Sequence, residues 1–147
     1  MTAPISFTEE LLITAAMMAA TVFFHATVIS AAAGLFRTAK RPLWGPMRFL
    51  RDSLVLSAAS LILLAAHSAE VAAWAGVMVK AGAFTEFEEA FYFASVAFTT
   101  LGFGDVLLPA DWRLLSGAIA ADGFILFGMS AAFLFEAVRK ARIGDAT

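Results

Sequence analysis

Three long runs of the sequence are almost free of charged residues, and each is long enough to cross a membrane. They cover residues 11–36, 53–79 and 113–138. A transmembrane helix needs about 20 predominantly apolar residues to cross about 30 Å of hydrocarbon. The chain is 61% hydrophobic and 15% charged, against about 45–50% and about 25% in soluble domains. The sequence therefore predicts an all-α membrane protein with three transmembrane helices.

Basic residues are concentrated in the loop 37–52, between the first two runs, and in the tail 139–147. Cytoplasmic segments carry an excess of Lys and Arg, and two crossings separate loop from tail, so both are predicted to be cytoplasmic. The N-terminus is then outside. No basic residue precedes the first run, unlike a signal peptide, and the chain has no cysteine. We expect an integral protein of a bacterial inner membrane.

A shorter apolar segment lies between the second and third runs. Residues 89–99, EAFYFASVAFT, are typical of a helix about 16 Å long, which reaches about halfway through the hydrocarbon. The glycine-containing segment 100–105, TLGFGD, follows, and VLLPADW leads back to the surface. Non-helical backbone at membrane depth is tolerated only where protein buries it or where it lines a watery cavity. This pattern predicts a re-entrant pore helix and loop; the alternative is a hairpin lying in the membrane interface.

The segment Thr100 to Asp105 resembles Thr-Val-Gly-Tyr-Gly-Asp, the selectivity-filter signature of the potassium-channel pore family. The resemblance covers the second run, the half-helix, the filter and the third run, so the first run is an additional N-terminal helix. It implies a homotetramer in which the backbone carbonyls of Thr100, Leu101, Gly102 and Phe103 replace the water shell of K+. It also implies a channel and not an enzyme. K+ is then the permeant ion, with no cofactor, no nucleic acid and no soluble substrate as partner.

Two filter positions depart from that signature. Leu101 replaces the usual Val, and Phe103, before Gly104, replaces the usual Tyr. The resemblance implies that Phe103 packs against Phe93 of the half-helix without a hydroxyl to brace the filter. A potassium-selective channel is the preferred interpretation, and a poorly selective channel for monovalent cations is the alternative.

Tyr92 is the only tyrosine, and it stands where relatives often carry a Trp that bonds the filter aspartate. We expect the Tyr92 hydroxyl to donate to the Asp105 carboxylate; the alternative is a Tyr at the interface with its hydroxyl in water. Other acidic residues are also expected outside, where they would raise the local cation concentration. These residues are Glu9, Glu10, Glu86, Glu88, Glu89 and Asp111.

The third run is expected to line the inner cavity. Gly123 stands where related inner helices often carry a hinge glycine. Phe127 and, two turns further on, Phe135 are candidates for a gate that closes by dewetting. Aromatic residues that simply pack helices together are the alternative for each of them.

Ionisable residues inside a membrane span are functional candidates by default. His67 and Glu70 are three residues apart, hence on one helix face, and Asp122 lies at a similar depth in the third run. We expect a buried cluster of these three, which either holds helices together or senses pH. A competing hypothesis places a haem between His25 and His67, and a further one is an accessory structural subunit. The position of the first span is left open, although the outer rim is favoured.

Overall fold

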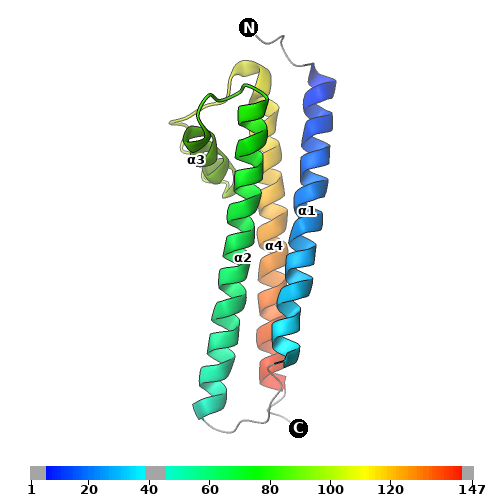
Figure 1. Cartoon of the computed structure of the whole chain (residues 1–147), viewed down its shortest axis with the longest axis vertical. Coiled ribbons are helices and arrows are strands. Elements are labelled where there is room, and N and C mark those ends of the chain that lie inside the picture. The colour runs from blue at the N-terminus through cyan, green and yellow to red at the C-terminus, as the bar shows by residue number, and fades with distance from the viewer. Residues whose placement is uncertain (1–5, 39–45, 144–147) are drawn as a thin grey trace.

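The structure is a computed structural model that describes residues 6–38 and 46–143, in which every regular element is a helix. Three long helices, α1 (Phe7–Thr38), α2 (Pro46–Lys80) and α4 (Arg113–Ile143), lie side by side along the molecule (Figure 1). The short helix α3 (Phe87–Phe98) packs near one end against α2 and α4. A 3₁₀ turn, η1 (Ala110–Trp112), leads into α4. The predicted all-helical fold is confirmed.

Each long helix contains a segment that is long and apolar enough to cross a membrane, over residues 7–34, 49–80 and 110–139. Helix α2 begins earlier than predicted, so the last residues of the loop predicted over 37–52 are helical. The first residue of α2 is Pro46. Proline suits the first position of a helix, because its φ is already helical and its missing N–H needs no partner. Residues 39–45 and 144–147, which belong to the predicted loop and tail, lie outside the described residues.

The turn after α2 directs the chain into α3. Gly82 adopts a φ of 78°, which glycine tolerates because it has no Cβ. The Ala83 N–H donates to the Met78 carbonyl at 2.9 Å, and the Gly82 N–H donates to the Val79 carbonyl at 3.1 Å. These two bonds form a Schellman motif, which satisfies carbonyls that the end of the helix leaves unpaired.

The apolar core fills the space between α2, α3 and α4. Its largest fully buried side chains are Trp74 and Met78 from α2, Phe98 from α3, and Leu115 and Ile119 from α4. Helix α3 is therefore held from two sides, and the chain that follows it starts from a fixed point.

Candidate functional site

In the segment after α3, residues with a left-handed backbone conformation (positive φ) alternate with residues whose φ is not positive. Thr100, Gly102 and Gly104 have φ values of 60°, 59° and 75°, whereas Leu101 and Phe103 between them do not have positive φ. Such alternation turns successive peptide groups the same way, so that their carbonyls can line one side of the chain. A positive φ is unusual for a β-branched residue such as Thr100, and strain of this kind concentrates at functional sites.

The first three amide hydrogens of this segment are bonded to the end of α3, beginning with the Thr100 N–H, which donates to the Ala97 carbonyl at 2.9 Å. The N–H groups of Leu101 and Gly102 both donate to the Val96 carbonyl, at 3.0 and 3.3 Å. In the part of the chain that the structure describes, no hydrogen bond is accepted by the carbonyl oxygens of residues 100–103. The donors are therefore held while the four acceptors stay available to a cation.

The predicted contact beside this segment is confirmed. The Tyr92 hydroxyl donates to the Asp105 carboxylate at 2.6 Å. This hydrogen bond lowers the pKa of Asp105 below its ordinary value and raises the pKa of Tyr92. Both side chains are exposed, so the bond links the loop to α3 at the surface of the chain.

Tyr92→Phe should move the pKa of Asp105 up toward the ordinary carboxyl value, because it removes the donor that stabilises the ionised form. The contribution of this bond to stability is present above the ordinary carboxyl pKa and is lost as pH falls through the lowered one. The measurement is an NMR titration of the Asp105 carboxyl carbon in both proteins. Asp111 is an internal control because its carboxylate does not contact Tyr92. Identical Asp105 curves would contradict the assignment.

The side chains of the segment are not covered within one chain. Phe103 is 65% exposed and Leu101 is 60% exposed. The predicted packing of Phe103 on Phe93 is not made within one chain, where the buried Phe93 ring packs against Phe84 with centroids 5.5 Å apart. For an assembly of chains it stays a prediction. The turn before α3 brings Phe84 over the face of α3 that carries Phe93. The apolar Phe103 and Leu101 are thus left for a neighbouring surface.

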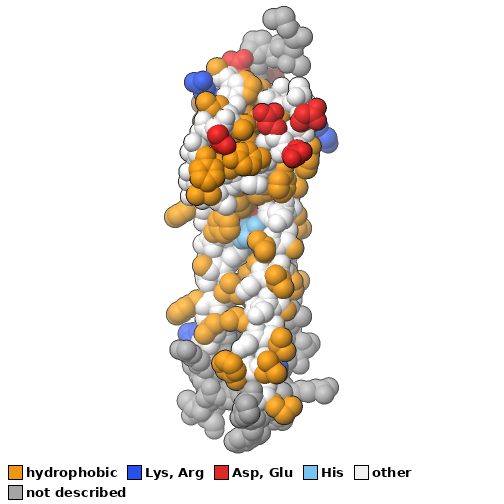
Figure 2. Space-filling view, turned by 90° about the vertical axis from the view of Figure 1, so that its left-hand side faces the viewer, with side chains coloured by type: hydrophobic (Ala, Val, Ile, Leu, Met, Phe, Trp, Pro, Cys, Tyr) orange, Lys and Arg blue, Asp and Glu red, His pale blue; other side chains and the backbone are white. Residues whose placement is uncertain are grey.

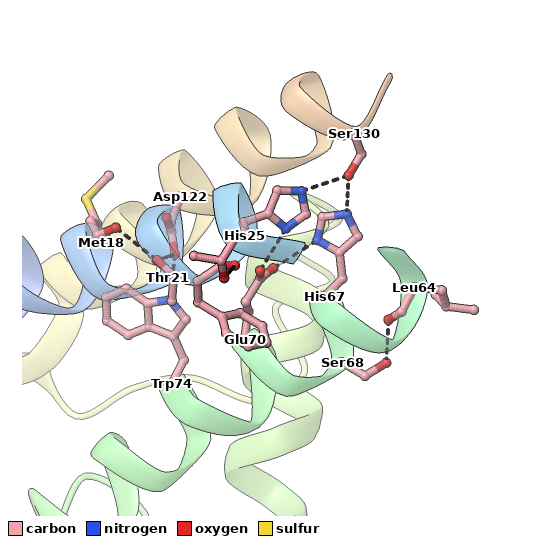
Figure 3. Close-up of polar contacts among 12 residues, drawn as sticks. Met18, Thr21, His25, Leu64, His67, Ser68, Glu70, Trp74, Asp122 and Ser130 are labelled. Atoms are coloured by element: carbon pink, nitrogen blue, oxygen red, sulfur yellow. Dashed lines mark hydrogen bonds and ion pairs between the residues drawn. The ribbon is translucent and has the colours of Figure 1, made fainter. Parts of the chain in front are cut away.

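Four side chains between α1, α2 and α4 form a closed hydrogen-bonded ring, which we call the histidine ring (His25, Glu70, His67 and Ser130). The Glu70 carboxylate contacts His25 Nδ1 at 2.8 Å and His67 Nδ1 at 3.0 Å. On the other side, the Ser130 Oγ contacts His25 Nε2 at 2.9 Å and His67 Nε2 at 3.1 Å. All four residues are buried, and Figure 3 shows both imidazoles between the carboxylate and the hydroxyl.

Asp122 belongs to a separate network. Its Oδ2 accepts hydrogen bonds from the Thr21 hydroxyl at 2.8 Å and from the Trp74 indole at 2.9 Å. Its Oδ1 is buried without a partner. The predicted cluster of His67, Glu70 and Asp122 is therefore divided in two, although all three residues are buried as expected. The rotation of α4 about its own axis, which directs Asp122 toward Trp74 of α2, could not be predicted from the spacing of the charged residues.

His25 and Ser130 were not predicted as members of the histidine ring. Ser130 belongs to a series of buried residues in α4 spaced by three or four positions, which marks the face turned toward α1 and α2. On α1, the polar residues Thr21 and His25 are four apart and so share a face. A polar stripe on an otherwise apolar span was the signal that could have found them.

Helix α1 packs against both α2 and α4 of its own chain. Besides the contacts of Thr21 and His25, the buried Glu10 carboxylate accepts the Leu115 N–H at 3.1 Å. This N–H lies in the first turn of α4, where helix N–H groups lack partners within the helix. Polar contacts at three levels therefore attach α1 to the other two long helices.

Gly123 allows α4 to approach the end of α3. A Cβ at this position would overlap the Phe98 carbonyl oxygen and would lie 2.8 Å from its carbonyl carbon and 2.9 Å from its Cγ. The predicted hinge stays a prediction, and close approach is a separate requirement for glycine here. Both candidate gate residues are exposed, Phe135 at 72% and Phe127 at 39%, and the Phe127 ring also contacts His67 and Phe98.

The histidine ring suits hydrogen bonding better than metal or haem binding. Donor atoms of His25, His67 and Glu70 lie within 4.8 Å of one another. The two imidazoles are stacked with an interplanar angle of 24°. All four of their ring nitrogens already contact Glu70 or Ser130, so a metal ion would have to displace at least one of these contacts. Axial imidazoles of a haem approach the iron from opposite faces, and rings stacked at a centroid distance of 4.8 Å leave no space for a macrocycle between them.

Acidic side chains gather at the end of the molecule that carries α3 (Figure 2). The exposed acidic residues of this end are Glu9, Glu86, Glu88, Glu89, Asp105 and Asp111. Below this end, the surface along the long helices is mainly apolar in the same view. Such a surface suits lipid along the helices and water at the acidic end.

Comparison with known proteins gives one match. The model of a protein family described as "Ion channel" matches residues 59–140, which is more than half of the chain. The matched region includes α3, the segment after it, and most of α2 and α4, but it excludes α1. No curated protein and no solved structure matches the chain.

Proposed function

Because the chain belongs to this ion channel family, we propose that it conducts potassium ions as a homotetramer. Four copies of the segment 100–105 surround a common axis and form one selectivity filter. The carbonyl oxygens of Thr100, Leu101, Gly102 and Phe103 replace the water shell of the ion, as carbonyl rings do in potassium channels. The observation that carries this proposal is the alternating hand of the backbone at Thr100, Gly102 and Gly104.

The hydrogen bonds of the segment support this assignment. The N–H groups of its first three residues are bonded to the end of α3, and the carbonyls of residues 100–103 are not bonded within the described chain. Carbonyls that are already positioned need little reorganisation when a dehydrated cation enters. The C-terminal end of α3, which carries the negative end of the helix dipole, adjoins the same segment and favours a cation there.

Exposed apolar side chains support assembly. Leu101 and Phe103 are largely uncovered in the single chain although they flank backbone that lies at membrane depth. Packing against a neighbouring copy buries them and closes the four filters into a ring. The acidic end that includes Asp105 then forms the outer mouth, where negative charge concentrates cations.

The orientation of the protein follows from its basic residues. With the loop and tail in the cytoplasm, the acidic end faces outside and the N-terminus is outside as well. The proposed location is a bacterial inner membrane.

A reversal potential tests selectivity. Purified protein in a planar bilayer, with potassium on one side and sodium on the other, should give a current that reverses near the potassium equilibrium potential. Reversal near zero would contradict potassium selectivity and support the alternative of a poorly selective monovalent cation channel. Native mass spectrometry of the same sample should give a mass four times that of the chain, and a smaller assembly would contradict the single four-chain pore.

A further inference from the structure

The histidine ring has four hydrogen-bond contacts, but it has only three hydrogens to place in them when Glu70 is ionised and both imidazoles are neutral. Four contacts join its four side chains in a closed path. An ionised Glu70 has no hydrogen to donate, a neutral imidazole has one, and the Ser130 hydroxyl has one. His25, His67 and Ser130 therefore supply three hydrogens for four contacts, and one contact would join two lone pairs.

One added proton removes this conflict. If it lies on an imidazole, that ring donates to Glu70 and to Ser130, and the Ser130 hydroxyl donates to the other imidazole, whose Nδ1–H donates to Glu70. If it lies on Glu70 instead, the carboxyl donates to one Nδ1 and accepts from the other. Both arrangements place one hydrogen in each of the four contacts.

Charge leads to the same count. With both imidazoles neutral and Glu70 ionised, the ring carries a net charge of −1 while all its members are buried. Burial of an uncompensated charge is costly, and more so within a membrane. One added proton makes the ring electrically neutral.

The surroundings of the ring favour keeping this proton. From α4, the nearest additional titratable group is Asp122, whose carboxylate interacts electrostatically with Glu70 and His25. From helix α3, the uncharged Phe98 lies edge-on to His67 at a centroid distance of 5.8 Å. Among the described side chains, the ionic partners of Glu70 are His25 and His67, and no Lys or Arg contacts it. A proton on the ring is therefore what balances the charge of the Glu70 carboxylate.

We propose that the histidine ring is a binding site for one proton, and that this proton holds α1 to α2 and α4. The site joins one residue of α1, two of α2 and one of α4. Loss of the proton leaves two lone pairs in contact and a buried negative charge, so that the ring opens.

The ring contacts the parts of the protein next to the filter. The centroids of the His67 and Phe127 rings are 4.4 Å apart, and His67 also packs against Phe98, the last residue of α3. When the histidine ring opens, His67 is no longer held in place. The end of α3, to which the filter amides are bonded, then loses support. This coupling rests on the proposed channel function, whereas the proton site does not.

Glu70→Gln is a matched variant that removes the need for the proton and keeps the contacts. The amide oxygen of Gln accepts from one Nδ1–H and its N–H donates to the other Nδ1. The remaining Nε2–H donates to Ser130, whose hydroxyl donates to the second Nε2. Four hydrogens then fill four contacts with both imidazoles neutral and no net charge.

NMR of the intact protein in lipid tests the site directly. The chain has only two histidines, so isotope-labelled histidine reports on this ring alone, and a labelled Glu70 carboxyl reports on the third member. At neutral pH we expect one added proton, seen as one doubly protonated imidazole or as a protonated Glu70. In Glu70→Gln both imidazoles should be neutral. Two neutral imidazoles with an ionised Glu70 in the wild type, or two imidazolium rings, would overturn the proposal.

The dependence of the current on pH tests the coupling. In the wild type, most of the current should be lost as pH rises through the range in which NMR shows release of the proton. Glu70→Gln should keep its current over the same range. A confirmed proton with the same pH dependence in both proteins would overturn the coupling alone. Absence of any ion current from either protein would contradict the proposed function and leave the NMR result to decide the site.

Discussion

Gly102→Ala should abolish the potassium current while leaving the helices folded. Gly102 has a φ of 59°, and an L-residue with a Cβ pays about 1–2 kcal/mol in this region. In the proposed homotetramer the penalty from four chains is about 4–8 kcal/mol, and each 1.4 kcal/mol is a factor of ten. The conducting conformation should therefore become at least about 700-fold rarer. Relaxation to negative φ would turn a carbonyl away from the ion path.

The filter variant has a matched control in the same chain. Gly76 lies within α2, and a Cβ at Gly76 or at Gly102 would meet nothing within 4 Å. Within one chain, the two substitutions thus differ in backbone conformation and not in available space. Gly76→Ala should conduct like the wild type. A Gly102→Ala protein with unchanged current and selectivity would contradict the assignment of this segment as the filter.

Gly123→Ala should lower the thermal stability of the protein and the current together. The added methyl group would overlap the backbone of Phe98, which is buried at the end of α3 and has little freedom to move. Overpacking of this kind typically costs about 1–3 kcal/mol. The expected result is a lower unfolding temperature in detergent, with loss of current because α3 no longer positions the filter.

Gly117→Ala is the control for this prediction. Gly117 lies in the same helix, and a Cβ there would meet nothing within 4 Å. Alanine has the higher helix propensity, so the control should be as stable as the wild type or slightly more stable. If Gly123→Ala kept the wild-type unfolding temperature, the close approach of α4 to Phe98 would be contradicted.

The sequence by itself determined the three long apolar helices, and the short helix with its glycine-containing segment between the last two. Both follow from local rules: hydrocarbon has a fixed thickness, and backbone without partners is not tolerated within it. The contact between Tyr92 and Asp105 was also predictable, because the filter resemblance places both residues and the chain between them is short. The ion channel family was reached from the same segment.

Only the tertiary structure decided which side chains meet between the helices. Amphipathic spacing places His67 and Glu70 on one face of α2, but it does not give the rotation of α1 and α4 against that face. That rotation brings His25 and Ser130 into the ring with Glu70 and directs Asp122 to Trp74 and Thr21 instead. The need for glycine at Gly123 has the same origin. Helix packing depends on side chains from several elements at once, whereas the membrane acts on each span separately.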